Sequence, residues 1–117
     1  MTQRSKKYDL EERTFKFAKN CRDFIKNLSR TAANNEYSKQ LIRSSASVSA
    51  NYIETNEALS RKDYFHRVRI SRKEVKESKM WLNLIEVDEK LENVRKSLIQ
   101  EAFELTRIFG SILEKNI

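Results

Sequence analysis

One glycine and no proline occur in the 117 residues of this chain. Glycine and proline punctuate tight hairpins and irregular loops, so a chain almost without them favours long helices joined by brief connections and excludes an all-β fold. The length fits one domain with a modest core. With 38% apolar and 35% charged residues, the chain differs from a disordered polyelectrolyte. We therefore expect one ordered, all-α domain.

Apolar residues recur at three- and four-residue spacing in four stretches. The predicted helices span residues 9–28, 36–59, 61–86 and 89–115. Asn35 and Asp88 can cap the helices that follow them. Ser60 and Asp63 form a start that resembles a capping box. Because short connections make long helices antiparallel neighbours, the pattern predicts an up-down-up-down four-helix bundle that comprises the whole chain, residues 1–117, as a single domain.

Small residues gather in the middle of the second predicted helix, where the sequence has Ser44, Ser45, Ala46, Ser47, Ser49 and Ala50. Such side chains either let a neighbouring helix approach closely or face water, and the pattern fits both interpretations. Gly110 in the last helix weakens that helix by about 1 kcal/mol relative to alanine. It marks close packing or a fraying end.

Constellations for catalysis or metal binding are missing from the sequence. His66 is the sole histidine and Cys21 the sole cysteine, so neither a disulfide nor a thiol cluster can form within the chain. Cys21 falls in an apolar stripe, where a small buried hydrophobe is expected, and His66 is expected on a helix surface. One glycine cannot build a phosphate-binding loop. We expect no enzymatic activity, cofactor, metal or small-molecule substrate.

The sequence contains no run of about 18 apolar residues that could span a membrane. Residues 1–7 are polar and basic, and no apolar stretch of the signal-peptide type follows them. These two observations predict a cytoplasmic protein without a membrane partner.

Two pairs of carboxylates could converge as acid and base, Glu54 with Glu57 and Glu74 with Glu77. Structural pairing is favoured for Glu74 and Glu77, because they share a side of the third helix with apolar residues and can meet a cation or an amide from another helix. The residues predicted for this structural polar network are Arg43, Asn51 and Glu54.

The same side of the third helix forms a second, partly apolar seam. A bundle with four inward stripes has no internal use for such a seam, so we expect it between subunits of a homo-oligomer. The residues predicted for this subunit interface are Ile70, Glu74, Glu77, Trp81 and Leu84.

Basic side chains dominate the chain, which has a formal net charge of +7. On the third helix they fall within an arc of ~120° at helical spacing. This basic stripe consists of Arg61, Lys62, Arg69, Arg72, Lys73, Lys76 and Lys79. The outward side of the first helix adds Lys16, Lys19 and Lys26. Such a surface can release counterions from a phosphate backbone, although a charged arc also fits the solvated face of a helix.

Three blocks of the sequence follow a known pattern: residues 8–10, residues 40–54 with their Leu-Ile-Arg-Ser run, and residues 62–66, which Ile70, Glu74, Glu77, Trp81 and Leu82 continue. The pattern covers nearly the whole chain. It resembles the four-helix bundle proteins encoded in intervening sequences of bacterial large-subunit ribosomal RNA. Ser49 and Asn56 stand where that family usually has glycine.

The resemblance implies a non-enzymatic bundle that forms a ring-like homopentamer. Members of that family are similar to the accessory variability protein of diversity-generating retroelements, which uses a basic surface to engage nucleic acid and a reverse transcriptase. The leading hypothesis is therefore an oligomeric scaffold that binds RNA or DNA non-specifically through its basic residues. The alternative is a protein–protein interaction module in which the charges serve solubility alone.

Overall fold

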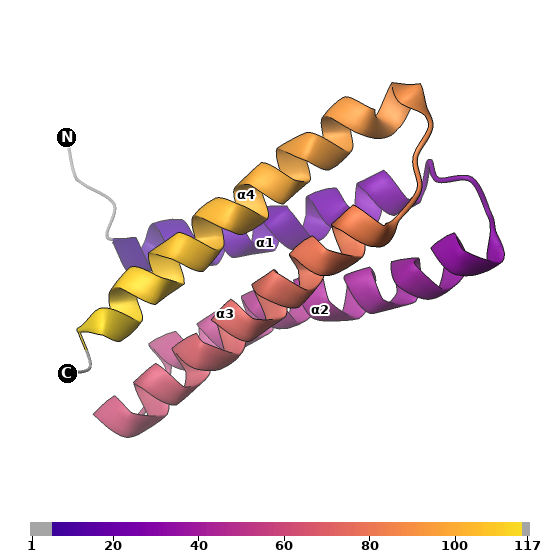
Figure 1. The fold of residues 1–117 in the computed structure, drawn as a ribbon. Coiled ribbons are helices and arrows are strands. Elements are labelled where there is room, and N and C mark those ends of the chain that lie inside the picture. The colour runs from indigo at the N-terminus through magenta and orange to yellow at the C-terminus, as the bar shows by residue number, and fades with distance from the viewer. Residues whose placement is uncertain (1–5, 116–117) are drawn as a thin grey trace.

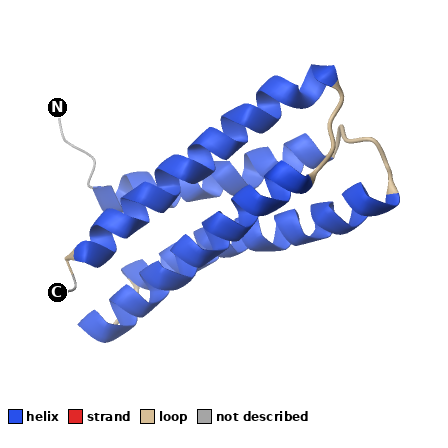
Figure 2. Cartoon of the chain, in the orientation of Figure 1, coloured by secondary structure: helices blue, strands red, loops and turns tan. Residues whose placement is uncertain are grey.

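The computed structural model describes residues 6–115, with side chains from Leu10 to Lys115. Most of the polar start that the sequence shows in residues 1–7 lies outside the described residues, and the side chains of the rest are not described. Four helices follow one another along the chain: α1 (Lys6–Ile25), α2 (Ala32–Asn56), α3 (Arg61–Leu84) and α4 (Glu89–Glu114). Between residues 6 and 115 no strand interrupts them (Figure 2).

Successive helices run antiparallel, so α1 begins and α4 ends at the same end of the molecule (Figure 1). Each helix packs against its two neighbours in the ring α1–α2–α3–α4, whereas in the described residues the Cα atoms of the diagonal pairs α1–α3 and α2–α4 stay more than 8 Å apart. Side chains of a diagonal pair still meet in the core, where the ring centres of Tyr52 on α2 and Phe109 on α4 lie 5.9 Å apart. This arrangement is the predicted up-down-up-down four-helix bundle.

Each helix contributes one apolar stripe to a common core. The buried residues recur every three, four or seven positions, which places them on one face of a 3.6-residue helix. They include Leu10, Phe17, Cys21 and Phe24 from α1, Leu41, Val48 and Tyr52 from α2, Val68, Val75 and Leu82 from α3, and Leu98, Ala102, Leu105 and Phe109 from α4. Burial of each Leu or Phe side chain stabilises the fold by about 1.5–3 kcal/mol.

Small residues bring α2 and α3 close together. Ser44 Oγ lies 2.7 Å from Ser78 Oγ inside the α2–α3 contact. Ser71 Oγ of α3 donates a hydrogen bond of 3.3 Å to the Val48 carbonyl, which places an α3 side chain directly on the α2 backbone. Close packing is therefore the correct interpretation for the buried serines of α2.

The start of α2 differs from the prediction. Asn35 was expected to cap this helix, but the helix begins four residues earlier than predicted and Thr31 is its N-cap. Thr31 Oγ1 accepts a hydrogen bond of 3.0 Å from the Asn34 amide. The prediction was wrong because threonine and asparagine are both good caps, and spacing alone does not choose between them.

The predicted caps of α3 and α4 are confirmed. Ser60 Oγ accepts a 3.0 Å hydrogen bond from the Asp63 amide, and the Asp63 carboxylate stands in the first turn, where the helix dipole favours a negative charge. Asp88 Oδ1 accepts a 3.1 Å hydrogen bond from the Lys90 amide.

Asn34 ties two connections together at one end of the bundle. Its Nδ2 donates to the Glu86 carbonyl at 2.9 Å and to the Ser29 carbonyl at 3.2 Å, and its Oδ1 accepts from the Glu86 amide at 3.0 Å. These bonds hold the backbone around Glu86 outside a helix, so α3 ends at Leu84, two residues earlier than predicted. Asn34 itself is only 2% exposed.

An ion-pair cluster joins α1 to α4. Arg13 Nη2 lies 2.7 Å from Glu101 Oε1 and 3.1 Å from Glu104 Oε1. The hydrogen bond to Glu101 raises the pKa of Arg13 above its usual value. Hydrogen bonds from Gln100, and then from Arg13, lower the pKa of Glu104.

Candidate nucleic-acid interface

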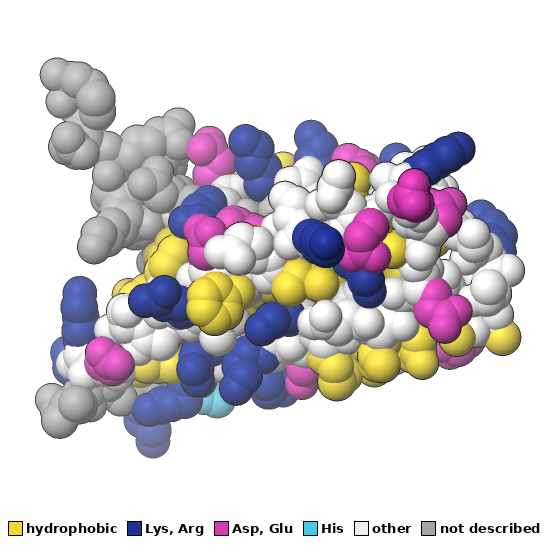
Figure 3. All heavy atoms as spheres, turned by 45° about the horizontal axis from the view of Figure 1, so that its top comes forward, with side chains coloured by type: hydrophobic (Ala, Val, Ile, Leu, Met, Phe, Trp, Pro, Cys, Tyr) yellow, Lys and Arg dark blue, Asp and Glu magenta, His cyan; other side chains and the backbone are white. Residues whose placement is uncertain are grey.

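Lysine and arginine side chains gather on the face of the bundle that α3 and α4 form together, mainly over the first half of α3 (Figure 3). Six of the seven cations of the basic stripe have no acidic partner among the described residues, and three of them, Arg69, Arg72 and Lys76, lie together on this face. Because no carboxylate neutralises them, these side chains keep their full attraction for a phosphate group.

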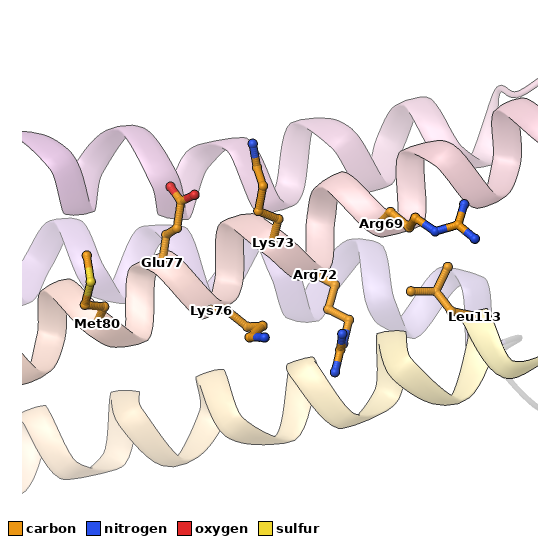
Figure 4. A pocket seen from close by; sticks show the side chains of 7 residues that line it. All are labelled: Arg69, Arg72, Lys73, Lys76, Glu77, Met80 and Leu113. Atoms are coloured by element: carbon orange, nitrogen blue, oxygen red, sulfur yellow. The ribbon is translucent and has the colours of Figure 1, made fainter.

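A shallow groove runs between α3 and α4 at these cations. We call it the α3/α4 groove; it has a volume of about 490 Å³ and is lined by Arg69, Arg72, Lys73, Lys76, Glu77, Met80 and Leu113. Figure 4 shows Arg72 and Lys76 extending from α3 toward α4, with Leu113 of α4 beside Arg69. Lys73 and Glu77 extend away from α4. One carboxylate therefore accompanies four cations in the lining of the groove.

Gly110 makes room for the most enclosed of these cations. A Cβ placed on Gly110 would lie 3.5 Å from Arg72 Nε, so the guanidinium group rests against the α4 backbone at this position. Arg72 Nε is buried and has no hydrogen-bond partner among the described residues. Of the two interpretations of Gly110, close packing is the correct one, because the residue faces Arg72 and lies inside α4.

The other cations of the basic stripe differ in their contacts. Arg61 Nη2 donates to the Lys115 carbonyl at 2.9 Å and its guanidinium lies 4.9 Å from the centre of the Phe65 ring. Lys73 Nζ lies 3.9 Å from Glu74 Oε2, a loose ion pair. Lys62 is exposed and has no partner in the described part of the chain.

Lys79 approaches an aromatic ring that the sequence analysis did not single out. Its Nζ lies 5.4 Å from the centre of the Phe103 ring on α4, and the Arg107 guanidinium lies 5.8 Å from the same centre. The signal in the sequence is that Phe103 lies next to Ala102 and so falls outside the apolar stripe of α4.

The predicted lysines of the first helix do not join this surface. Lys16 and Lys19 are exposed on α1, and Lys26 follows the end of α1 and lies 3.6 Å from Asp23 Oδ1. Since α1 lies diagonally across the bundle from α3, with their described Cα atoms more than 8 Å apart, the exposed lysines of α1 and the basic stripe form separate surfaces.

The polar seam between α2 and α3 is explained within one chain. Arg43 of α2 lies 3.4 Å from Glu74 Oε1 and 3.2 Å from Glu77 Oε1, so the predicted pairing of these acids with Arg43 is confirmed. Glu74 is 6% exposed, and removal of Arg43 would leave a buried carboxylate without its main counter-charge.

The other two residues of the predicted network lie elsewhere. Asn51 Oδ1 accepts a 3.2 Å hydrogen bond from Arg67, and its Nδ2 donates to the carbonyl and the hydroxyl of Ser47. Glu54 is exposed, and its side chain has no partner in the described chain. Asn51 therefore pairs across the same helices as Arg43 but with different residues, and Glu54 takes no part.

The apolar members of the predicted subunit interface are only partly exposed. The Trp81 ring packs 6.0 Å from the ring of Tyr37 on α2, and Ile70 is half-buried. Leu84 is 44% exposed. A place between subunits thus remains a prediction for these residues, and Leu84 has the largest exposed fraction of the three.

Cys21 and His66 lie where the sequence pattern places them, one in the core and the other on the surface. Burial raises the pKa of the Cys21 thiol to about 12, which keeps it protonated and poorly nucleophilic at neutral pH. His66 lies exposed on α3 as expected.

Over residues 10–115 no three His, Cys, Asp or Glu side chains converge as metal ligands. None of the described helices is long and apolar enough to cross a bilayer.

Comparison with solved structures finds a similar fold at 24% sequence identity. It is the crystal structure of a protein of unknown function from the S23 ribosomal protein family of Bacteroides thetaiotaomicron. The match has a TM-score of 0.74 and covers 89% of this chain and 97% of the other. A search of curated proteins gave no significant match. A sequence profile of the 23S rRNA-intervening sequence protein family matches residues 6–111, and the chain therefore belongs to this family.

Proposed function

We propose that this protein is an oligomeric helical-bundle scaffold that binds RNA or DNA non-specifically through the α3/α4 groove. The observation that carries the proposal is that three cations without acidic partners, Arg69, Arg72 and Lys76, line the same groove. Most other arginines of the described chain have a carboxylate, carbonyl, amide or ring partner, as Arg13, Arg43 and Arg95 do.

The groove fits phosphates better than base edges. Its polar groups are almost all cations, and cations on a phosphate backbone give affinity without sequence information. If four cations replace counterions on a single strand, log K should fall against log salt with a slope of about −3, and each lost contact should reduce the slope by roughly 0.7.

The test is titration of a fluorescent oligonucleotide, followed by anisotropy between roughly 50 and 200 mM salt. The variant Arg72→Gln/Lys76→Gln removes two charges from the groove. Its matched control, Lys16→Gln/Lys19→Gln, removes two charges from α1, and both variants lower the net charge from +7 to +5. We expect the groove variant to weaken binding and flatten the salt dependence, and the control to bind nearly as the parent does.

Three results would count against the proposal. The parent protein could fail to bind at low salt, or its affinity could stay constant as salt rises. Equal losses in the two variants would show that overall charge, and not the groove, attracts the nucleic acid.

Self-association is the second part of the proposal. On α2, Ile42 and Ile53 are 47% and 48% exposed, and the exposed Ala46 and Ala50 lie between them at helical spacing. This apolar α2 face supports contacts with further subunits. The family resemblance supports five copies, and the predicted seam around Leu84 is a second candidate interface.

Light scattering of charged variants distinguishes the two candidate interfaces. Leu84→Glu tests the seam, Ile42→Glu/Ile53→Glu tests the apolar α2 face, and Val94→Glu on α4, which is 44% exposed in the parent, is the control. We expect at least one of the two tests to shift the mass toward the monomer while the control does not. A parent protein that is already monomeric would reject self-association.

The apolar α2 face also favours a second candidate function, a protein–protein interaction module. In that case a partner protein covers Ile42 and Ile53, and the groove has no ligand. Partners recovered with the tagged protein should then survive nuclease treatment and disappear with Ile42→Glu/Ile53→Glu. Partners lost on nuclease treatment would contradict this alternative.

A further inference from the structure

Phe103 is a partly exposed aromatic side chain that the core does not use. The core stripe of α4 consists of Leu98, Ala102, Leu105 and Phe109. Phe103 follows Ala102 by one residue, so its side chain is turned by ~100° from the core direction. It is 42% exposed, and two cations lie over its ring, Lys79 from α3 and Arg107 from the next turn of α4.

The antiparallel register of α3 and α4 places Phe103 on the same seam as the groove. Arg72 lies against Gly110, and Lys79 lies against Phe103. From the first contact to the second, the residue number rises by seven on α3 and falls by seven on α4. Seven helical residues correspond to a distance of about 10 Å along the seam. Phe103 therefore stands two helical turns beyond Arg72, next to the end of the groove that Met80 lines.

An exposed ring beside a row of cations is the arrangement that binds unpaired bases. Cations follow the phosphate backbone, and the face of an aromatic side chain stacks on a base without regard to sequence. In a duplex the faces of the bases are already stacked on one another, so a ring at the protein surface gains this contact only with a single strand. In Figure 3 hydrophobic side chains lie among Lys and Arg side chains over α3 and α4.

From this geometry we infer that the α3/α4 groove takes single-stranded nucleic acid, with Phe103 as the stacking platform for a base. Lys79 and Arg107, which lie over the Phe103 ring in the free protein, turn to the phosphates of the bound strand when a base stacks there. The inference rests on the proposed function and narrows it from nucleic acid in general to strands with unpaired bases. Neither the groove nor Phe103 presents a group that tells RNA from DNA, so both strands are expected to bind.

The experiment compares four probes on the same protein: a single-stranded RNA, a single-stranded DNA of the same sequence, the DNA duplex, and inorganic polyphosphate, which has charge but no bases. Phe103→Leu removes the aromatic face and keeps an apolar side chain, whereas Phe103→Trp restores an aromatic face. The control is Phe15→Leu, at a 61% exposed phenylalanine on α1. Circular dichroism confirms that each variant is folded.

We expect Phe103→Leu to weaken binding of both single strands by roughly tenfold. Binding of duplex and polyphosphate should not change, Phe103→Trp should bind as the parent does, and Phe15→Leu should have no effect. Equal affinity of Phe103→Leu and the parent for single strands would overturn the inference. If Arg72→Gln/Lys76→Gln still weakened binding in that case, the proposed function would stand without it. If Phe103→Leu and Arg72→Gln/Lys76→Gln both weaken binding of single strands, the inference stands. If neither variant weakens this binding, the groove is rejected as the binding site.

Discussion

Replacement of Asn34 by alanine should cost the bundle about 3 kcal/mol. The side chain makes three hydrogen bonds, at 2.9, 3.0 and 3.2 Å, to the backbone of Glu86 and Ser29. Each such bond contributes about 1 kcal/mol net, and in the described residues none of the three backbone groups has another protein partner. The cost is large because one side chain holds both connections at this end of the bundle.

The measurement is urea unfolding, followed by circular dichroism and by the fluorescence of Trp81. The neighbouring variant Asn35→Ala is the control, because Asn35 is exposed and its side chain makes no hydrogen bond within the described residues. We expect the control to change stability by less than about 0.5 kcal/mol. The reasoning is refuted if Asn34→Ala costs less than about 1 kcal/mol or no more than Asn35→Ala.

Asn34→Asp separates the three hydrogen bonds. A carboxylate can still accept from the Glu86 amide, and its place in the first turn of α2 favours it by about 0.5 kcal/mol. It cannot donate to the Glu86 and Ser29 carbonyls, which costs about 2 kcal/mol. We therefore expect a net loss of at least about 1.5 kcal/mol, because burial of a charge at this 2% exposed position adds to the cost. Stability equal to that of the parent would show that the two donated bonds contribute nothing.

Three further changes test the core, the α1–α4 contact and the groove. Burial raises the pKa of Cys21 from 9.0 to about 12, so the thiol of the unfolded chain ionises first as pH rises. The free energy of unfolding should therefore fall above pH 9 by up to about 1.4 kcal/mol per pH unit. Urea unfolding of Cys21→Ala should show a shallower fall over this range. Arg13→Met should cost less than about 1 kcal/mol, because its ion pairs are partly exposed, and the cost should shrink at high salt. Gly110→Ala should raise stability by up to about 1 kcal/mol in urea unfolding, since a Cβ there meets Arg72 at an ordinary contact distance. The larger side chain of Gly110→Leu should displace Arg72 and weaken binding of an oligonucleotide.

The fold could be predicted because the core signal is periodic and local. Val68, Val75 and Leu82 are seven residues apart, and all three are fully buried on α3. Such spacing predicts one inward face whatever the neighbouring helices are. The lack of proline and the capping residues Ser60 and Asp88 then limited the connections, and the number, order and direction of the helices followed.

The helix ends at the Asn34 connection could not be predicted because they depend on contacts that are distant in sequence. Asn34 and Glu86 are 52 residues apart, and their hydrogen bonds decide where the chain leaves α3. A cap argument considers only the next few residues. Capping preferences alone therefore favour Asn35 at the start of α2, whereas Thr31 is the N-cap and Asn34 bonds to the backbone of Glu86.

The candidate site was predicted in part. The angle of 100° per residue was sufficient to place Arg69, Arg72 and Lys76 on one side of the third helix. It could not show that α4 forms the second wall of a groove, because that depends on the register of two helices. The same register brings Phe103 beside Lys79, and no pattern within one helix contains that contact.

The charge of the groove depends on how α3 separates its acids from its bases. Glu74 follows Arg72 by two residues and is therefore turned by ~200° around the helix. The α2 side of α3 carries the acids, and Arg43 supplies their counter-charge from α2. The α4 side carries Arg72 and Lys76 with no acid opposite them in the described part of α4. Because Arg43 already pairs with these acids on the far side, they lower the positive electrostatic potential of the groove only slightly. The polar seam with α2 and the basic groove with α4 are thus two consequences of one arrangement of charges on one helix.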